Sequence, residues 1–151
     1  MSVTAVAVDL DGALGDTRQL WQAWLEDASR RLRVDLPVPD DRGEAASVLD
    51  RAIGNWRPLL ERFAEEHAPV YLRPRAEASA ALRRLQGGGV RLGVFTDAPD
   101  ELARVALSHL GAARRLEAVE TGAGALERLL DRLGRGTTVV RNADELERLS
   151  P

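Results

Sequence analysis

Two carboxylates, Asp9 and Asp11, stand two positions apart and are followed directly by Gly12. They end the run 3–8, whose small and β-branched residues are typical of a strand buried on both faces of a parallel sheet. In an open α/β sheet, ligands bind beyond the carboxyl ends of the strands, so both acids would face a binding site. The alternative is that they only start a turn and cap the next helix.

A second apolar run, 90–95, ends in a hydroxyl and another acid, Thr96 and Asp97. Pro99, followed by acidic residues, is typical of the first turn of a helix, which we expect to run to about residue 110. The chain therefore contains two strand ends that carry polar side chains.

The elements that must position these side chains alternate from Ala76 onward. We expect further helices over 76–85, 123–133 and 143–149, and further strands over 116–120 and 137–140. Alternating helices and strands imply right-handed crossovers and parallel pairing. The predicted fold class is therefore α/β, a Rossmann-like three-layer parallel sheet of about four strands.

Two longer helical segments, 17–33 and 43–67, separate the first strand from this alternating part. Their apolar positions form wide stripes, and they hold all three tryptophans, so we expect a helical hairpin that buries these rings. Gly54 and Pro58 could bend or split the second segment. We interpret 16–68 as a small helical cap inserted after the first strand, with a core formed by 1–15 and 69–151.

The amino-acid composition excludes several kinds of partner and of catalytic chemistry. The net charge of -3 offers no electrostatic attraction to nucleic acid or to an acidic membrane. No apolar run approaches ~20 residues and no basic stretch precedes one, so we expect a cytoplasmic protein. The chain has no cysteine, which excludes disulfides and thiolate metal sites, and all 21 of its basic residues are arginine, which excludes lysine chemistry.

The two strand-end motifs, Asp9-Leu10-Asp11-Gly12 and Val94-Phe95-Thr96-Asp97-Ala98, resemble those of the haloacid dehalogenase-like (HAD) hydrolase superfamily, most of whose members are phosphatases. The resemblance covers nearly the whole chain, the helical cap included. The first motif of that family usually ends in Thr or Val, and Ala13 takes this place here. The second motif ends a hydrophobic strand with Ser or Thr, which is Thr96 here.

The resemblance implies a reaction and a set of roles. Asp9 would attack a phosphoryl group to form an aspartyl phosphate, and Asp11 would act as general acid and base. Thr96 and Asp97, with the amides at the following helix start, would hold phosphate oxygens. A magnesium ion would bind Asp9, the Asp11 carbonyl oxygen and a residue after the last strand. The substrate would be a small phosphorylated molecule.

The third and fourth family motifs are degenerate here. The family places a lysine, or less often an arginine, near the end of the third strand, where this chain reads Glu120-Thr121-Gly122-Ala123-Gly124. Asn142 takes the place of the metal-binding acid, and an uncharged amide is a weak ligand for Mg²⁺. We expect the neighbouring Arg141 to pair with Asp9 or Asp11 and to replace part of the missing charge. The alternative is a solvated arginine.

Three functions remain open at this point. The first is a phosphatase-type hydrolase weakened by the two degenerate motifs, with dehalogenation as a minor variant. The second is a non-catalytic protein of the same fold that binds a ligand or a protein partner through the same cleft. The third is a structural role in which the tryptophan-rich cap forms a dimer surface, since the sequence does not determine the oligomeric state.

Overall fold

The four strands form one parallel sheet, as the alternating pattern predicts. The computed structural model describes residues 2–151, and the strand order is β3-β2-β1-β4. The bounds are β1 (Ala5–Asp9), β2 (Arg91–Thr96), β3 (Ala118–Thr121) and β4 (Thr138–Val140). Each strand begins one or two residues later than expected. In the register, Asp9 lies beside Phe95, and Thr96 lies beside Thr121, so the carboxyl ends of β1, β2 and β3 meet at one edge.

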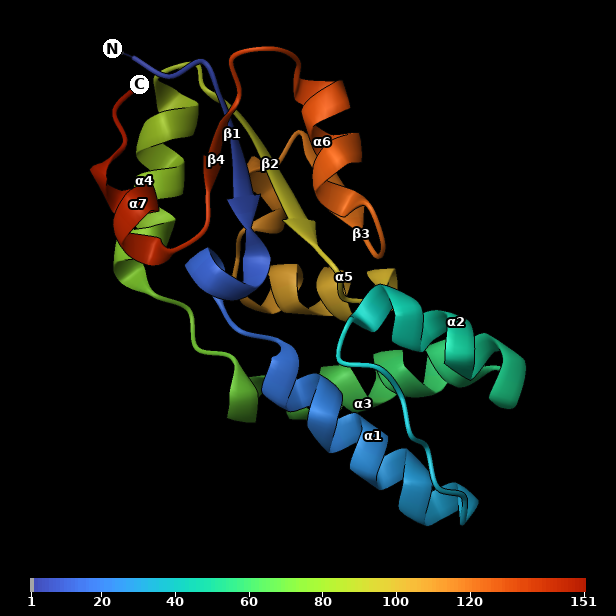
Figure 1. Cartoon of the computed structure of the whole chain (residues 1–151). Helices are drawn as coiled ribbons and strands as arrows, with labels where there is room; N and C mark the ends of the chain where they lie inside the picture. The colour runs from blue at the N-terminus through green and yellow to red at the C-terminus, as the bar shows by residue number, and fades with distance from the viewer. Residues whose placement is uncertain (1) are drawn as a thin grey trace.

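Helices cover both faces of the sheet, which gives the predicted three layers (Figure 1). Ala5 and Ala7 face the α6 side, whereas Val6 and Val8 join the core on the opposite side, under α4, α5 and α7. This alternation explains the nearly uninterrupted apolar character of β1. The bounds are α4 (Ala76–Gly87), α5 (Asp100–His109), α6 (Ala125–Leu133) and α7 (Ala143–Arg148).

The segment between β1 and α4 contains three helices rather than the predicted hairpin of two. They are α1 (Arg18–Leu32), α2 (Arg42–Ala52) and α3 (Trp56–Tyr71). The segment 43–67 is split at Gly54, one of the two positions named for a bend or split, because Ile53 is extended and Asn55 has a left-handed φ of 55°. The break expected at Pro69 is wrong: α3 continues to Tyr71, so the boundary drawn at 68 falls inside it.

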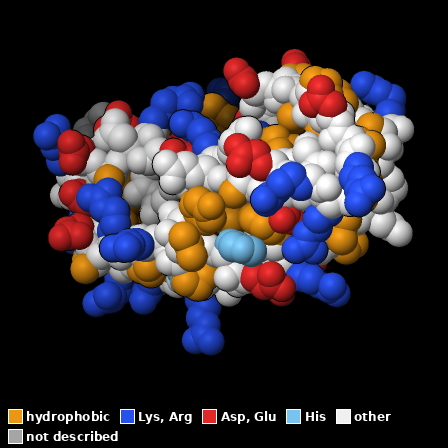
Figure 2. Space-filling model, turned by 90° about the horizontal axis from the view of Figure 1, so that it is seen from below, with side chains coloured by type: hydrophobic (Ala, Val, Ile, Leu, Met, Phe, Trp, Pro, Cys, Tyr) orange, Lys and Arg blue, Asp and Glu red, His pale blue; other side chains and the backbone are white. Residues whose placement is uncertain are grey.

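The three tryptophans form one buried cluster inside this segment. The ring centroids of Trp21, Trp24 and Trp56 lie 5.5 to 6.4 Å apart. All three side chains are buried, so the tryptophans are not available as a dimer surface. Seen from the side of α1 and α3, the surface mixes charged groups with patches of hydrophobic side chains (Figure 2), and Leu59 and Val70 of α3 are exposed. Within residues 2–151, no helix has the length and apolarity needed to cross a membrane.

Candidate active site

The two polar strand ends lie in contact at the carboxyl edge of the sheet. After β1, residues Leu10–Leu14 form a single π-helical turn, which places Asp11 beside the end of β2. The Thr96 hydroxyl donates a hydrogen bond of 2.7 Å to Asp11 Oδ2. Asp9 is the last residue of β1, and one of its carboxylate oxygens accepts a hydrogen bond of 3.2 Å from the Asp11 amide. Parallel pairing thus brings together all three predicted groups.

Gly12 is required at this turn by a close backbone approach. A Cβ atom built on Gly12 would lie 1.9 Å from the carbonyl oxygen of Arg141, in the loop after β4. Real Cβ atoms do not come this close to an oxygen, so any side chain would push the π-helical turn away from that loop. The glycine of the first motif therefore lets the turn that carries Asp11 pack against the end of β4.

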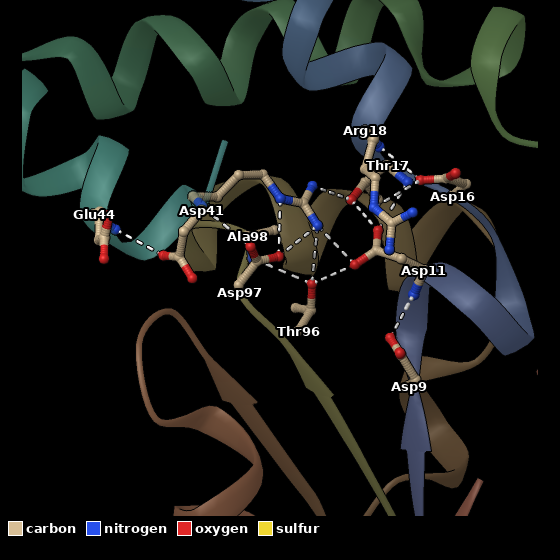
Figure 3. A network of polar contacts seen from close by, with 11 residues as sticks. Asp9, Asp11, Asp16, Thr17, Arg18, Asp41, Glu44, Thr96, Asp97 and Ala98 are labelled. Atoms are coloured by element: carbon tan, nitrogen blue, oxygen red, sulfur yellow. Dashed lines mark hydrogen bonds and ion pairs between the residues drawn. The ribbon is translucent and has the colours of Figure 1, made fainter. Parts of the chain in front are cut away.

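Asp11 is buried and accepts four hydrogen bonds (Figure 3). Its Oδ1 atom accepts from the amide and the hydroxyl of Thr17, at 3.0 and 2.5 Å. Its Oδ2 atom accepts from the Thr96 hydroxyl and from Nη2 of Arg42, each at 2.7 Å. The carboxylate is therefore fully engaged by protein groups from three different parts of the chain.

Arg42, the first residue of α2, is the site residue that sequence reasoning missed. It is 2% exposed, and its guanidinium contacts Asp11, Thr17 and Asp97 at 2.7 to 3.0 Å. One signal could have found it: Arg42 has the same helical phase as the buried residues Ala45 and Leu49. A charged residue in the apolar stripe of a helix needs a buried partner.

Asp97 directs its carboxylate to Arg42. Its two oxygens accept hydrogen bonds from the Arg42 amide, Nε and Nη2, at 2.8 to 3.0 Å. The side chain of Asp97 therefore binds the cap arginine. An anionic carboxylate is also an unfavourable neighbour for a phosphate. The next amide, that of Ala98, donates to the Thr96 hydroxyl at 3.2 Å.

The two aspartates of the first motif have pKa values shifted in opposite directions. Burial, together with the nearby Asp11 carboxylate, raises the pKa of Asp9 above its ordinary value. Burial alone would also raise the pKa of Asp11, but the charge of Arg42 and the hydrogen bonds from Thr17 and Thr96 outweigh it and lower that pKa. Asp11 is thus held as a carboxylate in this arrangement.

Arg141 does not form the ion pair that we expected. In the described chain, its guanidinium makes no hydrogen bond or salt bridge to Asp9 or Asp11, so the pairing hypothesis is wrong. The guanidinium lies 5.7 Å from the centre of the Phe95 ring, and the residue is exposed. Its charge still acts on Asp9, whose pKa it lowers in part against the effect of burial. The buried pairing partner of the first motif is Arg42.

A cavity of about 330 Å³ lies at this edge of the sheet. Its walls include Asp9, Asp11, Thr96 and Arg141, and the loop 122–126 closes one side. The resemblance to the HAD superfamily would place the third motif at this loop, which contains no basic residue. Arg128 of α6 reaches back to the loop carbonyls and to Glu120, and it is not among the residues that line the cavity.

The residues after β4, where the resemblance would place the fourth motif, do not fit the expected magnesium site. The Asn142 oxygen accepts a hydrogen bond from the Glu145 amide at 2.9 Å and thereby caps α7. Asn142 also lines a cavity different from the one that contains Asp9. Within residues 2–151, no three His, Cys, Asp or Glu side chains are grouped so that they could hold one ion. Because Mg²⁺ sites depend on carboxylates, this donor set is insufficient.

Comparison with solved structures identifies the architecture. A HAD-superfamily hydrolase of subfamily IA, variant 1, from Geobacter sulfurreducens superimposes with a TM-score of 0.59 at 20% sequence identity, over 97% of this chain and 84% of that one. The chain has the HAD hydrolase fold. A HAD phosphatase from Thermococcus onnurineus matches with a TM-score of 0.55 at 18% identity, over 97% of both chains.

A third structure with this fold, CbbY from Rhodobacter sphaeroides in complex with phosphate, matches with a TM-score of 0.71 at 16% identity, over 95% of this chain and 83% of that one. The sequence itself matches no protein-family model and no curated protein. At these identities the comparisons establish the HAD fold only. The activity of this chain must be inferred from the residues of its own site.

Proposed function

We propose that the chain is a HAD-like hydrolase of the phosphatase type that acts on a small phosphorylated molecule. The observation that supports this most is the convergence of Asp9, Asp11 and Thr96 on one polar cavity. These are the nucleophile, the general acid/base and the phosphate-holding hydroxyl that the family resemblance assigns. The phosphate bound to CbbY, which has the same fold, is consistent with this proposal.

The reaction divides into two steps. A carboxylate oxygen of Asp9 attacks phosphorus, the bond from phosphorus to the leaving oxygen breaks, and Asp11 donates a proton to that oxygen. In the second step water attacks the aspartyl phosphate and gives its proton to Asp11. The phosphorus–oxygen bond to Asp9 then breaks, which releases phosphate and restores the carboxylate. Arg141, at the wall of the cavity, adds positive charge near the phosphoryl oxygens.

Three features of the site support slow turnover. Asp11 must carry a proton to serve as the general acid, yet Arg42 and two threonines hold it ionised. The basic residue of the third motif is missing, and the fourth motif lacks the acids for magnesium. Removal of one preorganised charge-stabilising group typically costs ~100- to 1,000-fold in rate, so we propose turnover well below that of an intact site.

A second candidate is a non-catalytic protein that binds an anionic ligand in the same cavity. The observation that favours it is the saturation of the Asp11 carboxylate by four hydrogen bonds, which satisfies that group without any substrate. In this case the two arginines that line the cavity, Arg18 and Arg141, would attract the anion, and no bond would be broken.

Hydrolysis of an aryl phosphate by the full chain, with and without magnesium, tests the proposal. Asp9→Asn removes the nucleophile but keeps the size of the side chain. Asp100→Asn, the same chemical change on the surface of α5, is the matched control. The proposed enzyme loses its activity in Asp9→Asn and keeps it in Asp100→Asn. Equal rates in all three proteins would exclude catalysis by Asp9, and phosphate binding without turnover would favour the second candidate.

A further inference from the structure

Helix α2 is joined to its neighbours in the chain by two largely exposed connections. In the first connection, 33–41, all residues are exposed except the half-buried Leu36, Val38 and Pro39, and the second connection, 53–55, is exposed apart from the half-buried Ile53. The helix itself buries only Arg42, Ala45 and Leu49. Because few apolar contacts hold it, α2 belongs to the part of a fold that opens locally at low cost unless polar contacts hold it.

The first two residues of α2 contact the core, Arg42 through polar groups and Gly43 through close packing. The main chain and side chain of Arg42 bind the carboxylate of Asp97, and Nη2 also binds Asp11. Gly43 packs flush against the loop after β3, since a Cβ atom on it would lie 2.9 Å from that of Ala123. The start of α2 therefore binds the π-helical turn, the end of β2 and the β3–α6 loop, which are three walls of the same cavity.

The attachment of α2 to the core depends on a buried ion pair between Arg42 and Asp11. The side chains of Arg42 and Asp11 are each 3% exposed. Breaking a buried ion pair leaves a charge without compensation, which is strongly unfavourable unless that charge returns to water. A position in which Arg42 stays buried but has lost its two aspartate partners is therefore unfavourable.

The paired position occupies groups that a phosphoryl ligand needs. The Thr96 hydroxyl donates a hydrogen bond to Asp11, and Arg42 Nη2 lies 3.5 Å from the hydroxyl oxygen. A phosphoryl oxygen that accepts a hydrogen bond from the Thr96 hydroxyl would have to replace Asp11 as the acceptor. It would also bring negative charge close to Asp11 and Asp97, the two carboxylates that already share the one guanidinium of Arg42.

We propose that Arg42 is a latch that holds α2 over the ligand-free site, and that the site admits a phosphoryl group only after this latch is released. The proposal rests on the proposed function for the identity of the ligand. The latch itself is a property of the ligand-free chain and can be tested without turnover. Access of the ligand to the site is then controlled by the movement of α2 away from the core.

Amide hydrogen exchange of the full chain measures the latch directly. In Arg42→Met, which keeps the length of the side chain but removes its charge, the amides of α2 should exchange at least ~10-fold faster relative to those of β1 and β2 than in the wild type. Arg104→Met, on the exposed surface of α5, should leave this ratio unchanged. A ratio in Arg42→Met equal to that of the wild type would show that Arg42 does not hold α2. If Arg42→Met does not fold, Asp97→Asn weakens the same latch and should raise the ratio less.

Inorganic phosphate then tests the release. Phosphate that binds the wild type, detected by broadening of its phosphorus resonance, should raise the exchange of the α2 amides toward that of Arg42→Met. Bound phosphate with α2 still fully protected would overturn the proposal that release is required. If the wild type binds no phosphate, Arg42→Met should bind it, and binding by neither protein would overturn the release. Asp9→Asn is predicted to keep the latch even when it has no activity, so failure of the proposed function is separable from failure of the latch.

Discussion

Thr96 Oγ1 lies 2.7 Å from Asp11 Oδ2 although 85 residues separate them in the chain. The whole cap and helix α4 are inserted between the two, and the parallel pairing of β1 with β2 brings them back together. The candidate site thus depends on the register of two central strands. The cap then adds Arg42 to the same carboxylate.

Replacement of Arg42 by methionine should destabilise the fold. The substitution leaves Asp11 buried with hydrogen bonds but without a counter-charge, and loss of one partner of a buried ion pair costs about 3 kcal/mol. Urea unfolding at pH 7 measures the free energy of unfolding. Arg104→Met removes an exposed pair with Asp100 and should change it by less than about 0.5 kcal/mol. An equal, small effect of both substitutions would refute the buried pairing.

The effect of Arg42→Met should depend on pH, through Asp11. The pKa of Asp11 is lower in the folded chain than its ordinary value of 3.8, so the ionised carboxylate stabilises the fold. This contribution is fully present above the unfolded pKa and is lost as the pH falls through the folded pKa. The difference in unfolding free energy between wild type and Arg42→Met should therefore be greatest near neutral pH and shrink below pH 3.8. A difference that stays constant over this range would contradict the assignment.

Gly12→Ala should damage the site through the backbone. The added methyl group would lie 1.9 Å from the Arg141 carbonyl oxygen, so the π-helical turn must move. Overpacking of this kind costs about 1–3 kcal/mol, and the hydrogen bond between Asp11 and Thr96 should be lost with it. Gly87→Ala, at the end of α4, meets no atom within 4 Å and should change the stability little or raise it. Thermal unfolding of both variants distinguishes the two cases, and an equally small effect at Gly12 would argue against the close approach.

Asn142 should behave as a helix cap. Asn142→Ala removes the hydrogen bond to the Glu145 amide and should cost about 1 kcal/mol, whereas Asn142→Asp keeps an acceptor and should cost only a few tenths. Since Asn142 lines a cavity other than that of Asp9, Asn142→Asp should not by itself create a tight magnesium site. Calorimetric titration with magnesium checks this, and a large gain in affinity would show that residue 142 can reach Asp9.

The sequence predicted the sheet and the first two motifs because both are local patterns. The apolar runs, Gly12 and Pro99 mark strand ends and helix starts within a few residues of where they lie. The convergence of Asp9, Asp11 and Thr96 then follows from parallel pairing alone. The sequence named Gly54 and Pro58 as positions where the second cap segment could split, and the split lies at Gly54, whereas Pro58 lies in the first turn of α3.

The charge pairing could not be predicted from spacing. Arg141 follows a strand end and was the obvious partner for Asp9 or Asp11, but its guanidinium lies over Phe95 instead. Arg42 reaches Asp11 because α2 folds back over the sheet, which is a property of tertiary packing. The only local sign was a charged residue in phase with Ala45 and Leu49.

The most direct test of Asp9 as the nucleophile is a search for a phosphoryl group covalently bound to it. The full chain is incubated with an aryl phosphate and magnesium, quenched in acid, cleaved into peptides and analysed by mass spectrometry. We predict one phosphoryl group on Asp9 after the acid quench, which is absent from Asp9→Asn and present in Asp100→Asn. A phosphoryl group on another residue, or none under conditions in which the wild type binds the ester, would contradict it.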